Sequence, residues 1–499
     1  MLIIKIINMK RIYNLILISL GLFIITSCSD DFITKEPMQN LSDETAIENV
    51  NDAQVALTGV YDRLQTSGYW GRGMQIYADL FADNGRMNTA NSGRYLNTYN
   101  WNIVTNTSPG LGMWDNAYDG INRANKVLEA IESKGFDADD LKGQALALRA
   151  MLHFDMVRLF AQTYTINDAT LAPGSDGNGG HLGVPLMLAS DPYAEPSRNT
   201  VNEVYTQVIA DLEEAMTLMD GDVDYFYFNK WGAEALLARV YLTRASGGGT
   251  DADYTAARDH ALNVINSGPY SLVSNADYIA SWIADFNTES IFYLKYTSVD
   301  YLYTDALGGA LKKSGYGDVV ANEDLLGLIP DGDVRQHLFY ANHDDNEVQM
   351  DFYDEDKSAE NYYVNKYPGR EGTDGVDNLP LIRLSEMYLI AAEAELELGN
   401  TGPAEDYIME IIDRAKPGAL ITEYGATLRE QIYNTIRIEL CFEGHRTFDI
   451  KRRQDDIIRI SVTNESVPRE LLFPSYLFAL PIPQEEMDAN ANMVQNYNY

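Results

Sequence analysis

A run of charged residues near the C-terminus has the composition of an acid–base site. Its members are Arg437, Glu439, Glu443, His445, Arg446 and Asp449. On a helix, residues three or four positions apart lie on neighbouring turns, which brings Glu439, Glu443 and Arg446 together. Glycoside hydrolysis requires two carboxylates facing across a cleft, about 5 to 9.5 Å apart. Carboxylates and guanidinium groups on adjacent turns also form charge-assisted ion pairs, and we favour this second interpretation.

Acidic residues are abundant throughout the 499-residue chain, which weakens any inference from one pair of carboxylates. Asp and Glu number 74 against 37 Lys and Arg, and the formal net charge is −37. Neighbouring acids therefore arise easily by chance. So negative a surface repels phosphate backbones and anionic lipid headgroups. We expect no nucleic-acid partner and no membrane binding through a basic patch.

No other catalytic or cofactor-binding motif appears in the sequence. The six histidines lack the H-E-x-x-H spacing, and the chain has no G-x-S-x-G motif, P-loop or dinucleotide fingerprint. Oxygen-rich loops at 220–224 and 351–356 do not follow the EF-hand spacing of calcium sites. We predict no catalytic residue, no cofactor and no metal site.

Aromatic and amide side chains in the segment 67–107 offer chemistry that suits sugars. Flat rings stack on sugar C–H faces, while Arg and Asn donate paired hydrogen bonds to vicinal hydroxyls or a carboxylate. A second candidate surface spans 282–316. The predicted ligand-binding residues are Tyr69, Trp70, Asn84, Arg86, Asn88, Tyr95, Tyr99, Tyr296 and Tyr301. Trp70 and Tyr95 are the foremost stacking candidates, and packing in the core is the alternative for each ring taken alone.

The N-terminus has the pattern of a secretory signal peptide. A short basic start precedes an apolar stretch from Leu15 to Ile25, which ends in Ile25-Thr26-Ser27-Cys28. That stretch is too short to span a hydrocarbon core of ~30 Å. A cysteine at this position resembles the bacterial lipobox, in which the thiol is lipidated. We expect lipid on Cys28 and membrane attachment through acyl chains only.

Helical periodicity dominates the remaining sequence and must position these groups. Apolar residues recur at spacings of three and four in 141–159, 204–219, 233–243, 254–265 and 384–398. The pairs 231–266 and 384–415 have lengths close to the ~34-residue period of tetratricopeptide repeats. Long stretches without sustained periodicity interrupt them at 67–107, 162–199 and 267–378. We predict a mainly helical, all-α fold in which tetratricopeptide-like helix pairs form a compact bundle with long irregular loop insertions.

The same patterns predict the organisation of the chain. We expect a signal peptide at 1–27, a lipidated tether at 28–44 and a single domain at 45–499. Within the domain, the predicted parts are an N-terminal helical half (45–266), a loop-rich insertion (267–380) and a C-terminal helical part (381–499). Thr200 and Glu203 form a capping-box pattern. A last long helix is predicted from Thr427 to about Phe442.

Three stretches toward the C-terminus carry a family resemblance. They are 381–394 (Leu-Ile-Arg-Leu-Ser-Glu-Met-Tyr-Leu-Ile-Ala-Ala-Glu-Ala), 437–449, and Leu480-Pro481-Ile482-Pro483 with its Gln495-Asn496 ending. Together with the lipobox and Gly183-Val184-Pro185-Leu186, they resemble the SusD/RagB family of outer-membrane, nutrient-binding lipoproteins of Bacteroidetes. One departure is Tyr497-Asn498-Tyr499, which stands where the family commonly shows Pro-Gly-Tyr.

The resemblance implies a function and a partner. Members of this family capture oligosaccharides, or other nutrients, without cleaving them, and are built on four tetratricopeptide-like units. The implied partner is a SusC-like TonB-dependent β-barrel, on which the protein sits as a lid. We therefore expect a glycan-binding lipoprotein, not an enzyme, that faces the cell surface on the outer membrane and delivers its ligand to this transporter. A protein-binding repeat scaffold and a surface glycoside hydrolase are the alternatives, and the identity of the glycan or peptide stays open.

Overall fold

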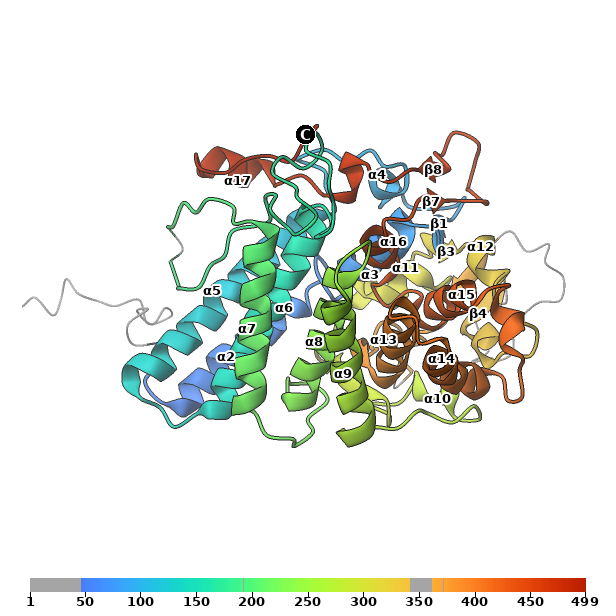
Figure 1. Ribbon diagram of the computed structural model, residues 1–499, viewed down its shortest axis with the longest axis horizontal. Helices are drawn as coiled ribbons and strands as arrows, with labels where there is room; N and C mark the ends of the chain where they lie inside the picture. The colour runs from blue at the N-terminus through green and yellow to red at the C-terminus, as the bar shows by residue number, and fades with distance from the viewer. Residues whose placement is uncertain (1–45, 192, 342–360, 371) are drawn as a thin grey trace, which may run out of the picture.

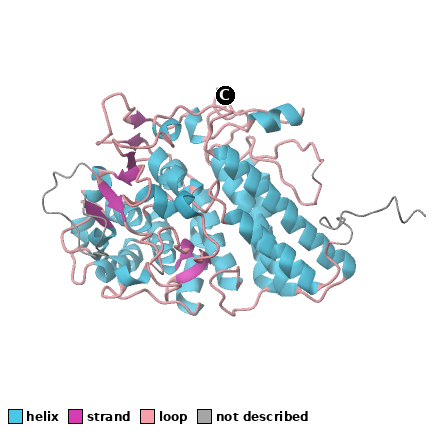
Figure 2. Cartoon of the chain, turned by 180° about the vertical axis from the view of Figure 1, so that it is seen from behind, coloured by secondary structure: helices cyan, strands magenta, loops and turns pink. Residues whose placement is uncertain are grey.

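The computed structural model describes residues 46–191, 193–341, 361–370 and 372–499. The predicted signal peptide, Cys28 and the tether lie outside these residues, as does the acidic loop 351–356. Among the described helices, none combines the length and the apolar character needed to span a bilayer. The described chain is mainly helical, with short strands confined to a few places (Figures 1 and 2), and this confirms the predicted fold class.

A series of long helices forms the body of the protein, and each packs against the next. In chain order they are α2 (Val50–Leu64), α5 (Gly110–Lys134), α6 (Asp139–Phe160), α7 (Val201–Leu218), α8 (Lys230–Ala245), α9 (Asp251–Ser267), α13 (Leu384–Glu397) and α14 (Thr401–Ala415). Figure 1 shows α2, α5, α6 and α7 on one side, α8 and α9 in the middle, and α13 and α14 on the other side. Helix α13 packs directly on α9, although residues 268–383 separate them in the sequence.

Helix boundaries follow the capping signals in the sequence. The Thr200 side chain accepts a hydrogen bond from the Glu203 backbone N–H, and Glu203 returns one, which confirms the predicted capping box. Thr427 and Glu430 cap α15 (Leu428–Leu440) in the same way. The remaining C-terminal elements are η4 (Ile421–Tyr424), α16 (Arg446–Arg453), β7 (Ile457–Ile458), β8 (Glu470–Leu471), η5 (Tyr476–Phe478) and α17 (Gln484–Ala489).

The first insertion, 67–107, contains more regular structure than its sequence predicts. It forms α3 (Gly73–Phe81), β1 (Gly85–Met87) and α4 (Leu96–Tyr99). Every residue of α3 from Met74 to Phe81 is buried. The helix has only nine residues, fewer than the window of about 11–18 residues over which helical periodicity is read. This insertion is thus part of the core as well as of the surface.

The third insertion, 267–378, joins the first through a small antiparallel sheet. Its elements are α10 (Tyr278–Ser281), β2 (Ser290–Leu294), η2 (Tyr303–Asp305), α11 (Leu307–Leu311), β3 (Val319–Ala321), α12 (Glu323–Leu326), η3 (Val334–Leu338), β4 (Phe339–Ala341) and β5 (Tyr362–Val364). The strand order is β1-β3-β5-β4, with Gly85 opposite Ala321 and Met87 opposite Val319. Strand β2 pairs separately with β6 (Leu379–Arg383), which leads into α13. The sheet therefore fixes the two insertions against each other.

Candidate ligand-binding site

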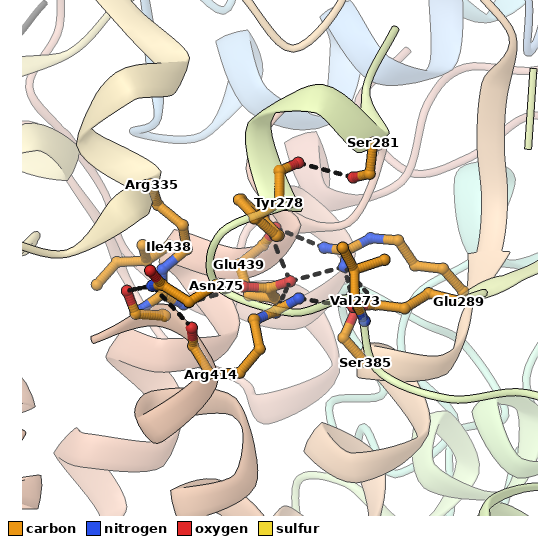
Figure 3. A network of polar contacts seen from close by, with 12 residues as sticks. Val273, Asn275, Tyr278, Ser281, Glu289, Arg335, Ser385, Arg414, Ile438 and Glu439 are labelled. Carbon is orange, nitrogen blue, oxygen red and sulfur yellow. Dashed lines mark hydrogen bonds and ion pairs between the residues drawn. The ribbon is translucent and has the colours of Figure 1, made fainter. Parts of the chain in front are cut away.

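Glu439 and Glu443, the two glutamates of the charged run 437–449, lie in the interior of the protein, and Figure 3 shows the contacts around Glu439. The Glu439 side chain is fully buried, and its carboxylate accepts hydrogen bonds from Arg383 at 2.6 Å, Arg414 at 2.6 Å and Arg335 at 3.0 Å. Glu443 accepts one from Arg383 at 2.7 Å and one from Lys366 at 2.6 Å. Burial alone would raise the pKa of Glu439, but the three guanidinium groups outweigh it and hold that pKa well below its usual range. We call these residues the Glu439 network.

Other members of the run also form ion pairs within the fold. Arg446 donates to Asp83 at 2.6 and 2.7 Å, and Arg437 lies 3.3 Å from the same carboxylate. Burial opposes ionisation of Asp83, yet these two arginines lower its pKa to about 2. His445 is neutral because burial lowers its pKa to about 4. The structure confirms that this run forms ion pairs, because Glu439 and Glu443 are buried and paired. It does not place them on neighbouring helical turns with Arg446, since α15 ends at Leu440 and Arg446 pairs with Asp83 instead.

The two rings at the start of the first insertion lie in the core. Tyr69 and Trp70 are at most 1% exposed, and both donate hydrogen bonds of 2.7 Å to the Asp155 carboxylate. Trp70 also packs against Gly444, where a Cβ atom would lie 2.9 Å from the ring. The backbone of Gly444 has a φ of +89°, so conformation and space both require glycine there. This position differs from the stacking role expected for Trp70, because the packed ring leaves no face for a sugar.

Most of the remaining predicted ligand-binding residues are also buried, namely Asn84, Arg86, Asn88, Tyr99 and Tyr296. Their polar groups hold the insertions in place. The Asn84 side chain donates to Asp79 and accepts from Arg437, both at 2.7 Å, and the Tyr296 hydroxyl donates to the Gln65 carbonyl at 2.6 Å. Long loops carry many backbone polar groups that need partners, and side-chain amides supply them.

Tyr95 and Tyr301 are only partly buried, and the structure brings their two segments together. Arg72 Nη1 lies 2.7 Å from Asp305 Oδ1, and Arg94 Nη1 lies 3.2 Å from the same atom. Arg94 Nε also donates to the buried carboxylate of Asp318 at 3.0 Å. The arginines come from the first insertion and the aspartates from the third. The two candidate surfaces are therefore one continuous site.

Tyrosine rings surround these arginines. The Arg94 guanidinium lies 3.7 Å from the centroid of the Tyr316 ring and 5.5 Å from that of Tyr95. The rings of Tyr301 and Tyr303 pack with centroids 4.3 Å apart, and Tyr303 is 65% exposed. We call this group the arginine–tyrosine cluster; its members are Arg72, Arg94, Tyr95, Tyr301, Tyr303, Asp305 and Tyr316.

A pocket of about 420 Å³ adjoins the cluster at Arg72 and Tyr95. It lies between the turn at 67–73, the segment 93–98 and the first turn of α5. Two buried polar atoms of its lining, Arg72 Nε and Tyr95 Oη, find no hydrogen-bond partner within the described chain, and neither does Arg94 Nη2 in the adjoining cluster. Burial raises the pKa of Tyr95, so its hydroxyl keeps its proton and can donate it. Unpaired donors at the edge of a pocket mark a place where a ligand can bind.

Backbone strain is concentrated at the same place. Tyr95 has a φ of +63° and Tyr303 a φ of +52°, in the left-handed region that side chains other than glycine seldom adopt. Such a conformation costs about 1–2 kcal/mol per residue, and the surrounding structure must supply that energy. Strained residues are frequent where a side chain has to be presented to a ligand.

Five members of the cluster were not among the predicted ligand-binding residues, namely Arg72, Arg94, Tyr303, Asp305 and Tyr316. One signal for Arg72 was its place between Gly71 and Gly73 in a tight turn. A Cβ atom on Gly71 would lie only 2.3 Å from the carbonyl oxygen of Gln65, so the turn is specific to glycine. In the described part of the chain, no group of three His, Cys, Asp or Glu side chains is arranged to hold a metal ion.

Comparison with known proteins gives a consistent result over the whole chain. Residues 31–242 match the family described as starch-binding associating with outer membrane, and residues 350–499 match the SusD family. The SusD-like protein P2 of Formosa agariphila is 28% identical, over 95% of this chain and 97% of that protein.

Solved structures agree with these sequence matches. A putative sugar binding protein from Bacteroides vulgatus is 31% identical with a TM-score of 0.79, covering 91% of this chain and all of that one. A SusD superfamily protein from Bacteroides thetaiotaomicron is 30% identical with a TM-score of 0.77, covering 90% of this chain and all of the other.

Proposed function

The chain belongs to the SusD family of carbohydrate-binding proteins, and from this premise we propose that it captures an oligosaccharide at the arginine–tyrosine cluster and the adjoining pocket. We propose further that it is a lipoprotein anchored through Cys28 to the outer membrane, facing the cell surface. Its partner would be a SusC-like TonB-dependent β-barrel, to which it delivers the captured glycan without cleaving it.

The observation that carries the glycan proposal is the coincidence of exposed rings, unpaired donors and a cavity. Tyr303 and Tyr316 are 65% and 48% exposed, which leaves ring surface for a sugar to cover. The pocket volume of about 420 Å³ lies within the range that binding sites for small molecules occupy. Arg72 and Arg94 can donate to sugar oxygens, and Asp305 can accept from a hydroxyl.

A glycan array followed by calorimetry tests this proposal on the full chain made without lipid by Cys28→Ala substitution. We expect at least one oligosaccharide to bind, and the double variant Tyr301→Ala/Tyr303→Ala to weaken its binding about tenfold, or ~1.4 kcal/mol. The matched control is Tyr193→Ala, because Tyr193 is 91% exposed but belongs to the 162–199 loop, outside the cluster. Equal loss in control and double variant would place the site elsewhere, and newly formed reducing ends would indicate a hydrolase.

Cell fractionation and affinity purification test the anchor and the partner. The native chain should remain with the outer membrane, and Cys28→Ala should become soluble when the barrel is absent, because acyl chains are then its only attachment. A tagged native chain should co-purify with a TonB-dependent barrel after detergent extraction. Co-purification with a barrel but binding to no glycan on the array would favour the protein-binding scaffold.

A further inference from the structure

In the described part of the chain, the pocket beside the arginine–tyrosine cluster is lined without acidic residues, in contrast to the protein as a whole. Acidic residues outnumber basic ones two to one in the chain, 74 against 37. Yet the described residues that line the pocket include Arg72 and no Asp or Glu. The first turn of α5 also lines it and carries no acidic residue, and the Ser108 hydroxyl accepts a hydrogen bond from the Gly110 backbone N–H at its start. The partial positive charge of this helix end therefore adds to that of Arg72.

Among the unpaired hydrogen-bonding groups at the pocket and in the adjoining cluster, donors outnumber acceptors. The unpaired atoms there, Arg72 Nε, Arg94 Nη2 and Tyr95 Oη, can all donate a hydrogen bond. Asp318 cannot serve them further, because it is fully buried and already accepts from Ser92 and Arg94. A surplus of donors calls for a ligand rich in acceptor oxygens.

Asp305 occupies the place that such a ligand would take. Its carboxylate bridges Arg72 and Arg94 at 2.7 and 3.2 Å, yet its side chain is 57% exposed. Arginine forks bind carboxylate and sulfate oxygens in the same way. An exposed carboxylate held only at the surface is bound weakly enough for another anion to compete with it.

We infer that the captured glycan carries an anionic group, the carboxylate of a uronic acid or a sulfate ester, and that Arg72 and Arg94 bind it at the pocket edge. This inference rests on the proposed glycan-binding function. The alternative within that function is a neutral sugar whose neighbouring hydroxyls contact the Arg72–Asp305 pair. The anionic sugar and the neutral sugar predict opposite effects of Asp305→Asn on glycan affinity.

Matched oligosaccharides provide the first part of the test. Calorimetry on the full chain carrying Cys28→Ala would compare tetramers of galactose, galacturonic acid and sulfated galactose, and likewise tetramers of glucose, glucuronic acid and sulfated glucose. We expect an acidic tetramer to bind at least tenfold more tightly than its neutral counterpart. Preference for the uronic acid over the sulfated sugar, or the reverse, identifies which anion the site takes.

Single substitutions provide the second part. Arg72→Gln should weaken the acidic tetramer about tenfold and Arg72→Lys by less, because Lys keeps the charge but not the fork. Asp305→Asn should strengthen it severalfold, because a competing carboxylate is removed. The matched control is Arg123→Gln, an arginine paired with Asp119 at 3.0 Å and lying about 15 Å along α5 from Met113 in the pocket. This control should change the affinity for neither the acidic nor the neutral tetramer.

The possible failures are distinguishable. Equal or tighter binding of a neutral tetramer, or weaker binding in Asp305→Asn, overturns the anionic inference and leaves glycan binding in place. If no tetramer binds, neutral or acidic, and the glycan array is empty, the result counts against both the anionic inference and the proposed glycan-binding function. Circular dichroism and the unfolding midpoint of each variant show whether a loss of affinity is only a loss of folding.

Discussion

The Glu439 network and the arginine–tyrosine cluster use the same kinds of side chain for different ends. In the network, Glu439 is buried among three arginines that hold its carboxylate at 3.0 Å or less. In the cluster, Arg72 and Arg94 share one half-exposed carboxylate, and donors on both remain unpaired. The presence of Arg, Asp and Tyr together therefore says little about function. What distinguishes a structural charge from a binding charge is whether its pairing is complete within the fold.

The largest expected effect comes from breaking the network. Glu439→Gln should lower the free energy of unfolding by about 3–5 kcal/mol, since three buried guanidinium groups lose their shared counter-charge. Asp305→Asn, the equivalent change in the cluster, should alter it by less than about 1 kcal/mol because that pair is exposed. Urea unfolding of both variants measures the difference. Similar losses in the two would contradict the contrast.

The pH dependence of the unfolding free energy gives a second test of the Glu439 network. The pKa values of Glu439 and Glu443 are lowered by their cationic partners, so their stabilisation is fully present above the unfolded value near 4.5. It is lost as the pH falls through the folded values, because the unfolded chain takes up protons first. We expect the unfolding free energy to fall steeply below pH 4.5, and less steeply in Glu439→Gln. A parallel pH profile in that variant would show that other groups govern acid unfolding.

Trp70→Ala tests whether the first insertion is core or binding surface at that position. Loss of a buried indole should cost about 3–5 kcal/mol of stability, and it also removes a hydrogen bond to Asp155. Trp70→Phe retains most of the ring volume and should bind the glycan as the native chain does. Calorimetry with unfolding measured alongside would separate the two roles. Weak binding by a stably folded Trp70→Phe variant would show that the Trp70 ring takes part in ligand binding.

Tyr95→Ala is expected to have a smaller effect that falls on binding. Tyr95 lies at the pocket edge with an unpaired hydroxyl, so glycan affinity should fall about tenfold, or ~1.4 kcal/mol. Stability should fall only modestly, because alanine keeps the backbone strain at φ +63° and loses the packing of a partly buried ring. Tyr99→Phe is a suitable control, since Tyr99 is buried and its hydroxyl contacts Thr463 in the fold. Unchanged affinity in Tyr95→Ala would remove it from the site.

Tyr303→Gly should produce the smallest change, and it should move stability and affinity in opposite directions. Glycine adopts a φ of +52° without strain, so the unfolding free energy should rise by about 0.5–1 kcal/mol. The exposed ring is lost, so glycan affinity should fall about threefold. Denaturation and calorimetry on the same sample test both signs. A loss of stability would show that the ring supports the fold and not the ligand.

Periodicity and capping signals predicted the helical framework because each depends on neighbours within one or two turns. The Thr200–Glu203 capping box and the helix after Thr427 are of this kind. Helix α3 escaped prediction because its nine residues are too few to show sustained periodicity. The spacing of Glu439 and Glu443 indicated ion pairs, but their partners Arg335 and Lys366 lie far away in the sequence.

The site was harder to predict, since sequence composition cannot separate a ring in the core from a ring beside a pocket. Trp70 and Tyr95 stand in the same aromatic segment, and only tertiary packing assigns one to Asp155 and the other to the pocket. The contact between Arg72 and Asp305 spans 233 positions of the chain. No local pattern reports a pairing of that range, so the two surfaces appeared separate until the fold joined them.

The bridge that Asp305 makes to both arginines has a consequence for how long a captured ligand stays. A carboxylate that can reoccupy the arginines as soon as a sugar loosens favours dissociation. At a dissociation constant of about 10 µM and an association rate of ~10⁶ M⁻¹s⁻¹, the bound lifetime is on the order of 0.1 s. A protein that must hand over its cargo gains from so brief a hold, whereas one that stores ligand would not. Asp305 would then determine how quickly a captured ligand is released.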